Sequence, residues 1–164
     1  MATIIYQSNT GSTKRYAEML SEKLSLPLYP LSDADNVNLD EEIIFLGWVM
    51  AGEIQGLSQA RAKFRNIRCI CAVGITNNDK NTAEVEEKNS VTEPFFTLSG
   101  DFHIDRLKGM YKMMMSMMIK MLKSKLKEKP AAESEKIMTI FENGVDQVSE
   151  DKLDGVISFL SVQS

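Results

Sequence analysis

Short apolar runs alternate with longer amphipathic stretches along this chain, and this alternation limits the folds that the chain can adopt. After the first run, residues 12–24 place apolar side chains at helical spacing. Strands that alternate with helices are typical of an α/β domain with a parallel sheet. The sequence therefore predicts an α/β domain with strands at the apolar runs, which are residues 3–6, 28–31, 43–46, 69–76 and 95–98.

The composition of two of these strands indicates where each lies in the sheet. The four consecutive apolar residues at 43–46 predict a strand covered by helices on both faces. Pro27 and Pro30 bracket the run at 28–31 and favour the sheet edge, because proline cannot donate to an interior ladder. Right-handed crossovers allow few topologies. Among them we expect the order 2-1-3-4-5, which places the ends of strands one, three and four around a ligand-binding crevice. The predicted fold is a three-layer sandwich around a five-stranded parallel sheet.

The segments between and after these strands have weaker patterns. The stretch at 32–40 is rich in Asp and Asn and predicts a loop or a single turn. Residues 47–53 predict a loop after the third strand. One helix is expected from the end of this loop to about residue 66, and others at 81–91 and 105–127. Further helices are expected after Pro130, in an extra C-terminal part that ends near residue 160.

Length and composition restrict the functions that the chain can have. With 164 residues, we expect one domain over 1–164 that needs no disulfide to hold it together. A net charge of −4 argues against a nucleic-acid partner, which normally requires a basic surface. The start of the chain has no basic and apolar leader, and no apolar stretch has the length of a membrane span. A cytoplasmic location is expected.

The two cysteines, Cys69 and Cys71, lie two residues apart in an apolar run. On a strand they would point to the same face about 6.6 Å apart, which is unsuitable for a disulfide. With a single histidine in the chain, a metal site is disfavoured as well. We expect both to be small buried core residues, with no metal bound.

A hydroxyl-rich loop connects the first apolar run directly to the first helix. The first backbone N–H groups of that helix have no partner within it, and the helix dipole favours an anion there. The short side chains add donors, and Gly11 permits a tight turn. The spacing fits neither of the common nucleotide-binding motifs, G-x-x-x-x-G-K-[ST] and G-x-G-x-x-G. The loop predicts a bound phosphate ester. The alternative is a capped helix start without a ligand, which has a similar sequence. The loop residues are Ser8, Asn9, Thr10, Gly11, Ser12 and Thr13.

This loop resembles the [ST]-x-T-G-x-T phosphate loop of flavodoxins at every position of the motif. The resemblance implies an FMN cofactor, with the flavin ring held between the loops that follow strands three and four. One wall would consist of Trp48, Val49, Met50, Ala51 and Gly52, and the other of Thr76, Asn77 and Asn78. The alternative for Trp48 and Met50 is that they pack under their loop. A phospho-acceptor domain of the same topology is disfavoured, because Gln7-Ser8 and Gly47-Trp48 stand where such domains need acidic residues.

The chain departs from flavodoxins after the fourth strand. Flavodoxins usually carry an acidic, tyrosine-containing G-x-G-D stretch there, and this sequence reads Gly74-Ile75-Thr76-Asn77-Asn78-Asp79-Lys80. The segment from Phe95 to Phe102 and the Met-rich helix after it resemble flavodoxin-domain proteins related to menaquinone-dependent protoporphyrinogen oxidase. That resemblance implies an FMN oxidoreductase or electron carrier whose partner is a quinone or a redox protein. No catalytic acid or base can be nominated from the sequence.

The helix expected at 105–127 is both Met-rich and basic. Residues 103–129 contain eight Lys or Arg and two acidic residues. We expect a core helix with a solvated lysine face; the alternatives are contact with an anionic membrane, a quinone site or an acidic partner. The second functional hypothesis is accordingly a non-catalytic binding module that uses this helix. Its apolar stripe consists of Leu107, Met110, Tyr111, Met114, Met117, Met118, Met121 and Leu122.

Overall fold

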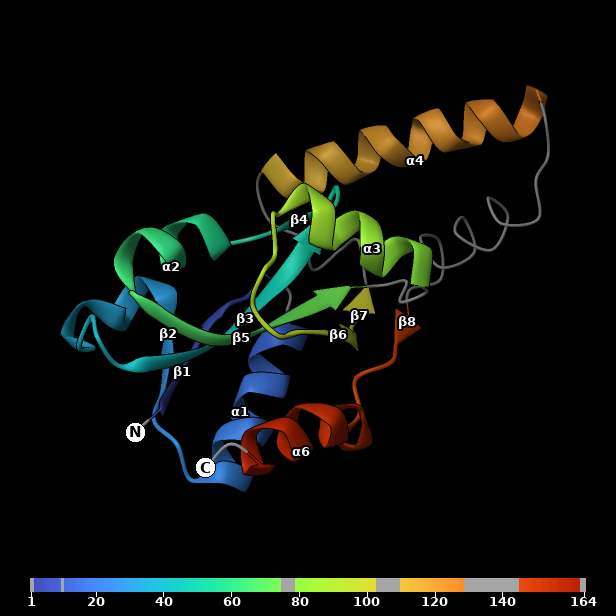
Figure 1. Ribbon diagram of the computed structural model, residues 1–164. Coiled ribbons are helices and arrows are strands. Elements are labelled where there is room, and N and C mark those ends of the chain that lie inside the picture. The colour runs from blue at the N-terminus through green and yellow to red at the C-terminus, as the bar shows by residue number, and fades with distance from the viewer. Residues whose placement is uncertain (1, 10, 75–78, 103–109, 129–144, 163–164) are drawn as a thin grey trace.

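A computed structural model of the chain describes residues 2–9, 11–74, 79–102, 110–128 and 145–162 (Figure 1). It contains the predicted alternation of strands and helices. The strands are β1 (Ala2–Gln7), β2 (Leu28–Pro30), β3 (Glu42–Met50), β4 (Glu53–Ile54), β5 (Asn66–Gly74), β6 (Phe95–Ser99), β7 (Asp101–Phe102) and β8 (Val145–Asp146). The helices are α1 (Ser12–Leu24), η1 (Leu31–Asn36), α2 (Leu57–Lys63), α3 (Asp79–Lys88), α4 (Met110–Glu128), η3 (Glu150–Leu153) and α6 (Asp154–Val162).

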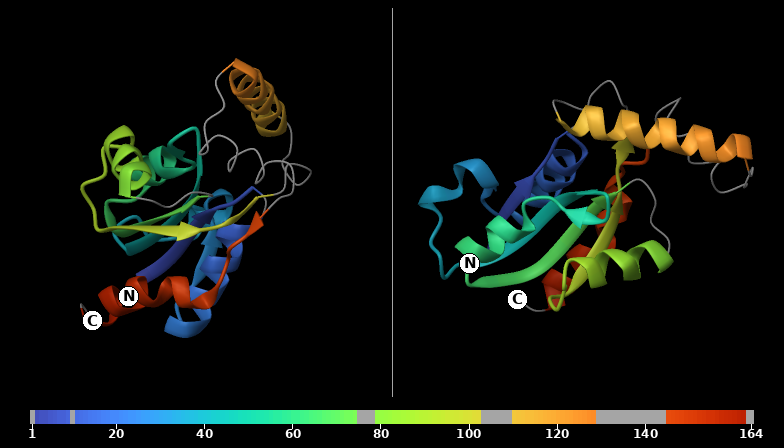
Figure 2. Two further views of the ribbon diagram at one scale, coloured as in Figure 1. Left: turned by 90° about the vertical axis from the view of Figure 1, so that its right-hand side faces the viewer. Right: turned by 90° about the horizontal axis from the view of Figure 1, so that it is seen from above.

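The main sheet has five parallel strands in the order β2-β1-β3-β5-β6. This is the predicted order 2-1-3-4-5, because β4 only forms a short antiparallel hairpin with β3. The proline-bracketed strand β2 lies at the edge, as predicted. Helices α1 and α6 cover one face of the sheet, and α2 and α3 cover the other (Figures 1 and 2). The α/β sandwich is thus confirmed.

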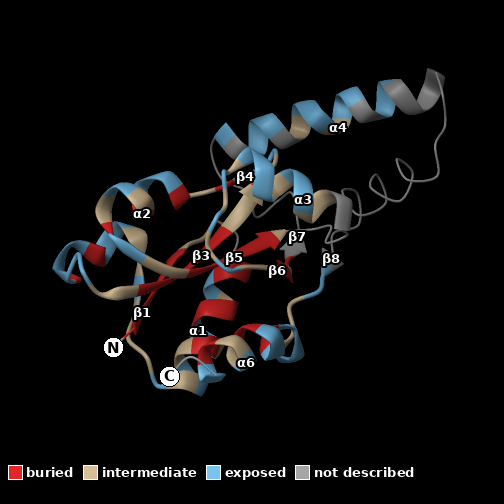
Figure 3. Ribbon diagram, viewed as in Figure 1, coloured by how far each residue is buried: buried red, intermediate tan, exposed pale blue. Residues whose placement is uncertain are grey.

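Two hydrophobic clusters lie on the opposite faces of the sheet. Successive residues of a strand point to opposite faces, so Ile44 enters the cluster on the α1 face and Phe45 the cluster on the α2 face. Both clusters consist mainly of buried side chains, and the central strands are the most buried part of the described structure (Figure 3). This double coverage explains the unbroken apolar run at 43–46. Cys69 and Cys71 are fully buried free thiols on the α1 face, as predicted.

Residues 47–53 differ from the prediction of a loop. Strand β3 continues to Met50, and a tight turn at Ala51 and Gly52 leads back into β4. Both turn residues have positive φ, 53° and 80°, as a type I′ hairpin turn requires. Of the residues predicted as one wall, Trp48, Val49 and Met50 therefore extend the central strand, and Ala51 and Gly52 form the turn.

Smaller differences occur elsewhere. The segment predicted as a single turn after β2 contains the six-residue 3-10 helix η1, which has a kink at Ala34. The α2 helix ends at Lys63, and α3 runs over Asp79–Lys88, slightly before its predicted position. A two-stranded ribbon of β7 and β8 precedes α6 and was not predicted. Helix α6 forms the predicted C-terminal helix.

The core position predicted for the Met-rich helix is wrong. Helix α4 lies at the periphery of the molecule (Figure 2), and of its residues with described side chains none belongs to either hydrophobic cluster. Six of its methionines are exposed, from 40% at Met114 to 65% at Met110. Among the described residues, no helix combines the length and the apolar character needed to cross a membrane.

Candidate functional site

The carboxyl ends of the parallel strands form one edge of the sheet, and the predicted site lies along it. The loop after β1 leads into α1, and the β3–β4 hairpin extends from the adjacent strand, since β1 and β3 pair directly up to Gln7 and Gly47. In open α/β sheets, ligands bind at this edge where the strand order reverses. The structure therefore brings the phosphate loop and the first predicted wall to neighbouring positions.

The loop after β1 is held by its own hydrogen bond and by Gly11. The N–H of Gly11 donates to Ser8 Oγ over 3.2 Å, and Gly11 has a φ of 107°. Apart from its chain neighbours, no atom of the described residues lies within 4 Å of where a Cβ on Gly11 would be, so the space beside it is open in this part of the structure. The positive φ requires a residue without a side chain, and the open space leaves room for a ligand to approach the backbone.

The start of α1 has the features of an anion site. The Arg15 N–H donates to the Gly11 carbonyl over 2.9 Å, which leaves the N–H groups just before Arg15 without partners inside the helix. Within the described part of the chain no side chain caps this helix, and its first turn contains no acidic residue. Negative charge at this end of the helix would be stabilised by the helix dipole.

Two buried polar atoms in the loop lack partners among the described residues. They are Asn9 Oδ1 and Thr13 Oγ1, and Thr13 is 1% exposed. A buried polar atom without a hydrogen bond costs about 1–3 kcal/mol, so such atoms normally have a partner. The Thr13 hydroxyl can donate to a phosphate oxygen, and the Asn9 amide can do so when its oxygen and nitrogen exchange places. The residues present thus fit a phosphate group.

The hairpin forms the other described side of the site. Gly47 is packed so tightly that a Cβ there would lie 2.6 Å from the Gln55 carbonyl oxygen. Of the predicted wall residues, Met50 is buried at 6% exposure, Trp48 and Val49 are half-buried, and Ala51 is exposed. Val49 packs against the hydrophobic cluster on the α2 face. The alternative of packing under the loop therefore applies to Met50, whereas Trp48 is only half-buried.

A clamp from the end of α3 holds this hairpin, and sequence reasoning did not find it. The Asn89 side chain accepts from the Ile54 N–H over 2.9 Å and donates to the Gly52 carbonyl over 2.8 Å. It also donates to the Val85 carbonyl of its own helix over 2.7 Å, and Lys88 Nζ donates to the Ala51 carbonyl over 2.6 Å. An Asn after a helix is an ordinary C-terminal signal, so its pattern alone could not have indicated this contact.

The second turn of α1 is connected to the chain after β6. The Tyr16 hydroxyl donates to the Ser99 carbonyl and accepts from the Ser149 N–H over 3.4 Å. Burial raises the pKa of Tyr16, with a smaller opposing effect of the Ser149 hydrogen bond. Gly100 lies against the phosphate loop, because a Cβ there would be 3.1 Å from Ser12 Oγ. These contacts fix the start of α1 relative to the end of β6.

Part of the predicted site lies outside the described residues. Thr10 of the phosphate loop does so, as does the whole second wall, Thr76, Asn77 and Asn78. Their assignment stays a prediction. The described site thus consists of the remaining loop residues, the start of α1 and the β3–β4 hairpin.

A parallel sheet of order 2-1-3-4-5 places this chain among the doubly wound α/β folds, in which ligands bind at the carboxyl edge of the sheet. Residues 3–129 match the family described as flavodoxin domain, which is most of the chain. The chain belongs to the flavodoxin domain family.

Comparison with solved structures gives a more distant similarity. A crystal structure from Bacteroides eggerthii DSM 20697, provisionally described as a flavoprotein, aligns at a TM-score of 0.40 and 15% sequence identity. The alignment covers 58% of this chain and 84% of that one. This similarity is too low to add to what the family match shows. No curated protein compared with the sequence matches it significantly.

Proposed function

We propose that this protein binds FMN at the carboxyl edge of its sheet and acts in electron transfer or as an oxidoreductase. The observation that carries the proposal is a pair of buried polar atoms, Asn9 Oδ1 and Thr13 Oγ1, that have no hydrogen-bond partner among the described residues. They lie beside the start of α1, which no described side chain caps, in a chain of the flavodoxin domain family. A phosphate monoester would satisfy these atoms and the free N–H groups together.

Each part of the site would have a separate task. Ser8 to Thr13 would bind the phosphate through backbone and hydroxyl donors, with Gly11 leaving room for its oxygens. Trp48 and the hairpin would cover one side of the flavin ring, while the predicted second wall at Thr76 to Asn78 would cover the other. When bound, the flavin supplies the hydride or electron chemistry, and the protein supplies orientation and electrostatics.

The redox partner belongs to the proposal as well. The similarity of the segment from Phe95 onwards to proteins related to menaquinone-dependent protoporphyrinogen oxidase supports a quinone or a redox protein as partner. Both cysteines are free thiols, which supports a reducing compartment such as the cytoplasm. The acidic net charge of −4 supports a partner other than nucleic acid.

Titration with FMN and with riboflavin tests this function. Binding to apo-protein is followed by the quenching of flavin fluorescence, and the absorption spectrum of the purified protein shows any flavin carried through purification. We expect FMN to bind at least about tenfold more tightly than riboflavin, because charge-assisted hydrogen bonds to the phosphate are worth about 1.5–3 kcal/mol. Equal affinity for the two would contradict the assigned phosphate loop, and no binding of either would contradict the redox function.

The alternative function is a non-catalytic binding module that uses α4. The exposed methionines of α4 favour it, since they have no place in the core. A protein that binds no flavin under any condition, and whose α4 variants alone lose an interaction, would establish this alternative.

A further inference from the structure

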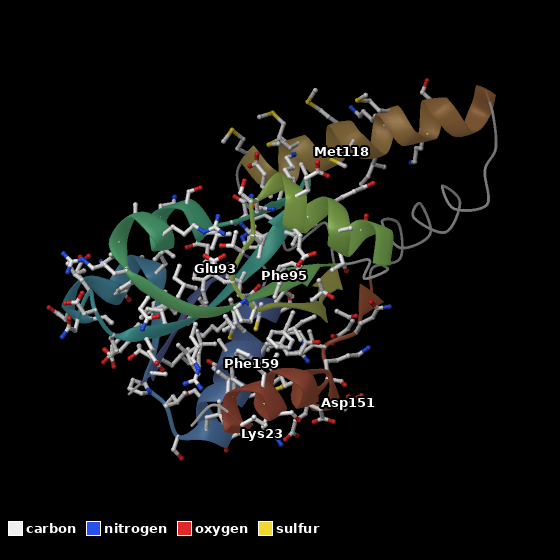
Figure 4. The ribbon with its side chains drawn as sticks, viewed as in Figure 1. Lys23, Glu93, Phe95, Met118, Asp151 and Phe159 are labelled. Carbon is white, nitrogen blue, oxygen red and sulfur yellow. The ribbon has the colours of Figure 1, made fainter. Side chains whose placement is uncertain are left out.

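Six exposed methionines form one continuous stripe on α4, which we call the methionine stripe: Met110, Met113, Met114, Met117, Met118 and Met121. Their spacing of three and four residues places them on one side of the helix, over a length of about 17 Å. Figure 4 shows sulfur-tipped side chains along the side of α4 that faces away from the sheet. Contiguous exposed apolar surface of this kind marks an interaction site.

The charge of α4 indicates what it contacts. The helix contains five lysines and one glutamate, a net charge of +4, whereas the whole chain carries −4 and the rest therefore −8. Lys112, Lys120 and Lys123 are exposed. By helical geometry, Lys112 and Lys123 lie on the side of α4 opposite the stripe, and Lys120 lies near the edge of the stripe. An apolar face with lysines on the polar face is typical of helices that lie in the plane of a membrane surface. The occupant that complements this helix is anionic and apolar at once.

We propose that α4 binds the surface of an anionic lipid bilayer through the methionine stripe. A second copy of the chain is disfavoured as the occupant, because two α4 helices would face each other with the same positive charge. A protein partner would need a groove fitted to a projecting helix, whereas a fluid bilayer surface meets all six methionines at once. The unbranched methionine side chain adapts easily to such an irregular apolar surface.

The position of α4 in the fold makes this contact physically accessible. The helix lies at the periphery, so it can reach a surface before the acidic remainder does (Figure 2). Repulsion between the acidic part and an anionic bilayer decays over a Debye length of about 8 Å at physiological salt. The helix lies on the bilayer rather than across it, in keeping with the absence of a spanning helix among the described residues.

Vesicle flotation with the full chain tests the proposal. The probes are vesicles of pure phosphatidylcholine and of phosphatidylcholine with one quarter phosphatidylglycerol. We expect binding to the anionic vesicles only, weakened severalfold by 0.5 M salt, which screens the lysines. Equal binding to both compositions, or binding to neither, would overturn the proposal. Because flavin need not be bound, the result is independent of the FMN titration.

Matched variants identify the surface. M114Q/M117Q/M121Q keeps a helix-forming residue of similar length at each position and should reduce vesicle binding by about tenfold or more. The control Y29Q/L39Q/V162Q changes three exposed apolar residues outside α4 and should leave vesicle binding unchanged. Unchanged binding of the α4 variant would contradict the role of the stripe. So would a dimer in light scattering that only this variant abolishes, since that would mean a second copy covers the stripe.

Discussion

The central strands and α4 both carry dense apolar residues, yet they use them differently. Along β3 and β5, consecutive apolar side chains fill two clusters on opposite faces of the sheet and have almost no exposed surface. On α4, methionines at regular helical spacing are exposed by 40–65%. A sequence pattern shows which side chains share a face, but it does not show what covers that face. The experiments below test this difference between the sheet and α4, and the parts of the site built on the sheet.

The largest expected effect comes from truncating one side chain of each region. Phe45→Ala removes a fully buried ring from β3 and should lower the free energy of unfolding by about 3–5 kcal/mol. Met117→Ala, at 60% exposure, should change it by less than about 0.5 kcal/mol. Urea denaturation followed by circular dichroism measures both. A loss of several kcal/mol in the α4 variant would mean that the helix packs against the fold and that the contrast does not exist.

The clamp on the β3–β4 hairpin should have the next largest effect. Asn89→Ala leaves the Ile54 N–H and the Gly52 carbonyl without their partner, at a cost of about 1–3 kcal/mol in unfolding free energy. It should also weaken FMN binding severalfold, because the hairpin loses its fixed position. The control Lys88→Ala removes one exposed hydrogen bond to the same hairpin and should have a much smaller effect on both. Equal effects of the two would show that the Asn89 side chain is not what fixes the hairpin.

Thr13→Val should weaken FMN binding without lowering the stability of the apo-protein. The substitution keeps the shape of the side chain and removes a buried hydroxyl that has no partner among the described residues. Unfolding free energy of the apo-protein should therefore stay the same or rise slightly. FMN affinity should fall about tenfold with riboflavin affinity unchanged, as isothermal titration calorimetry can measure. A drop in stability together with unaltered FMN affinity would assign Thr13 a structural role instead.

The smallest effect is expected for the ion pair between Arg61 and Glu93, which lies just before the start of β6. Burial alone would raise the pKa of Glu93, but hydrogen bonds from Arg61 and from backbone N–H groups outweigh it and lower the pKa below 4.5. Arg61 binds both carboxylate oxygens, over 3.2 and 2.9 Å. The stabilisation is fully present above the ordinary pKa and disappears as the pH falls through the lowered one.

Glu93→Gln should therefore cost about 1 kcal/mol at pH 7 and almost nothing once the pH has fallen below the lowered pKa of Glu93, as urea unfolding at a series of pH values would show. The exposed Arg65–Asp40 pair is the matched control, and Asp40→Asn should give no measurable change at either pH. A difference between the wild type and the Glu93 variant that is independent of pH would rule out the ionised pair as its source.

Much of the fold could be predicted because local chemistry determines it. The apolar run at 43–46 can only be a strand covered on both faces, and Pro27 and Pro30 restrict β2 to an edge. The hairpin was missed because Ala51 adopts a positive φ, which its residue type does not signal. The start of the phosphate site was predictable from the hydroxyl-rich loop, whereas the Asn89 clamp depends on a contact between residues 37 positions apart. The exposure of α4 was unpredictable because an amphipathic stripe has the same pattern against a core, a membrane or a partner.

The burial of both cysteines has a practical consequence for labelling. Cys69 and Cys71 are fully buried, and the hydrogen bond between them and their burial raise the pKa of Cys71. The thiolate is the form that reacts with maleimides, so the native chain should be almost inert to these reagents. A single substitution such as Met117→Cys would then give the molecule its one reactive thiol, at the centre of α4. An environment-sensitive dye attached there would report directly on whatever surface this helix meets.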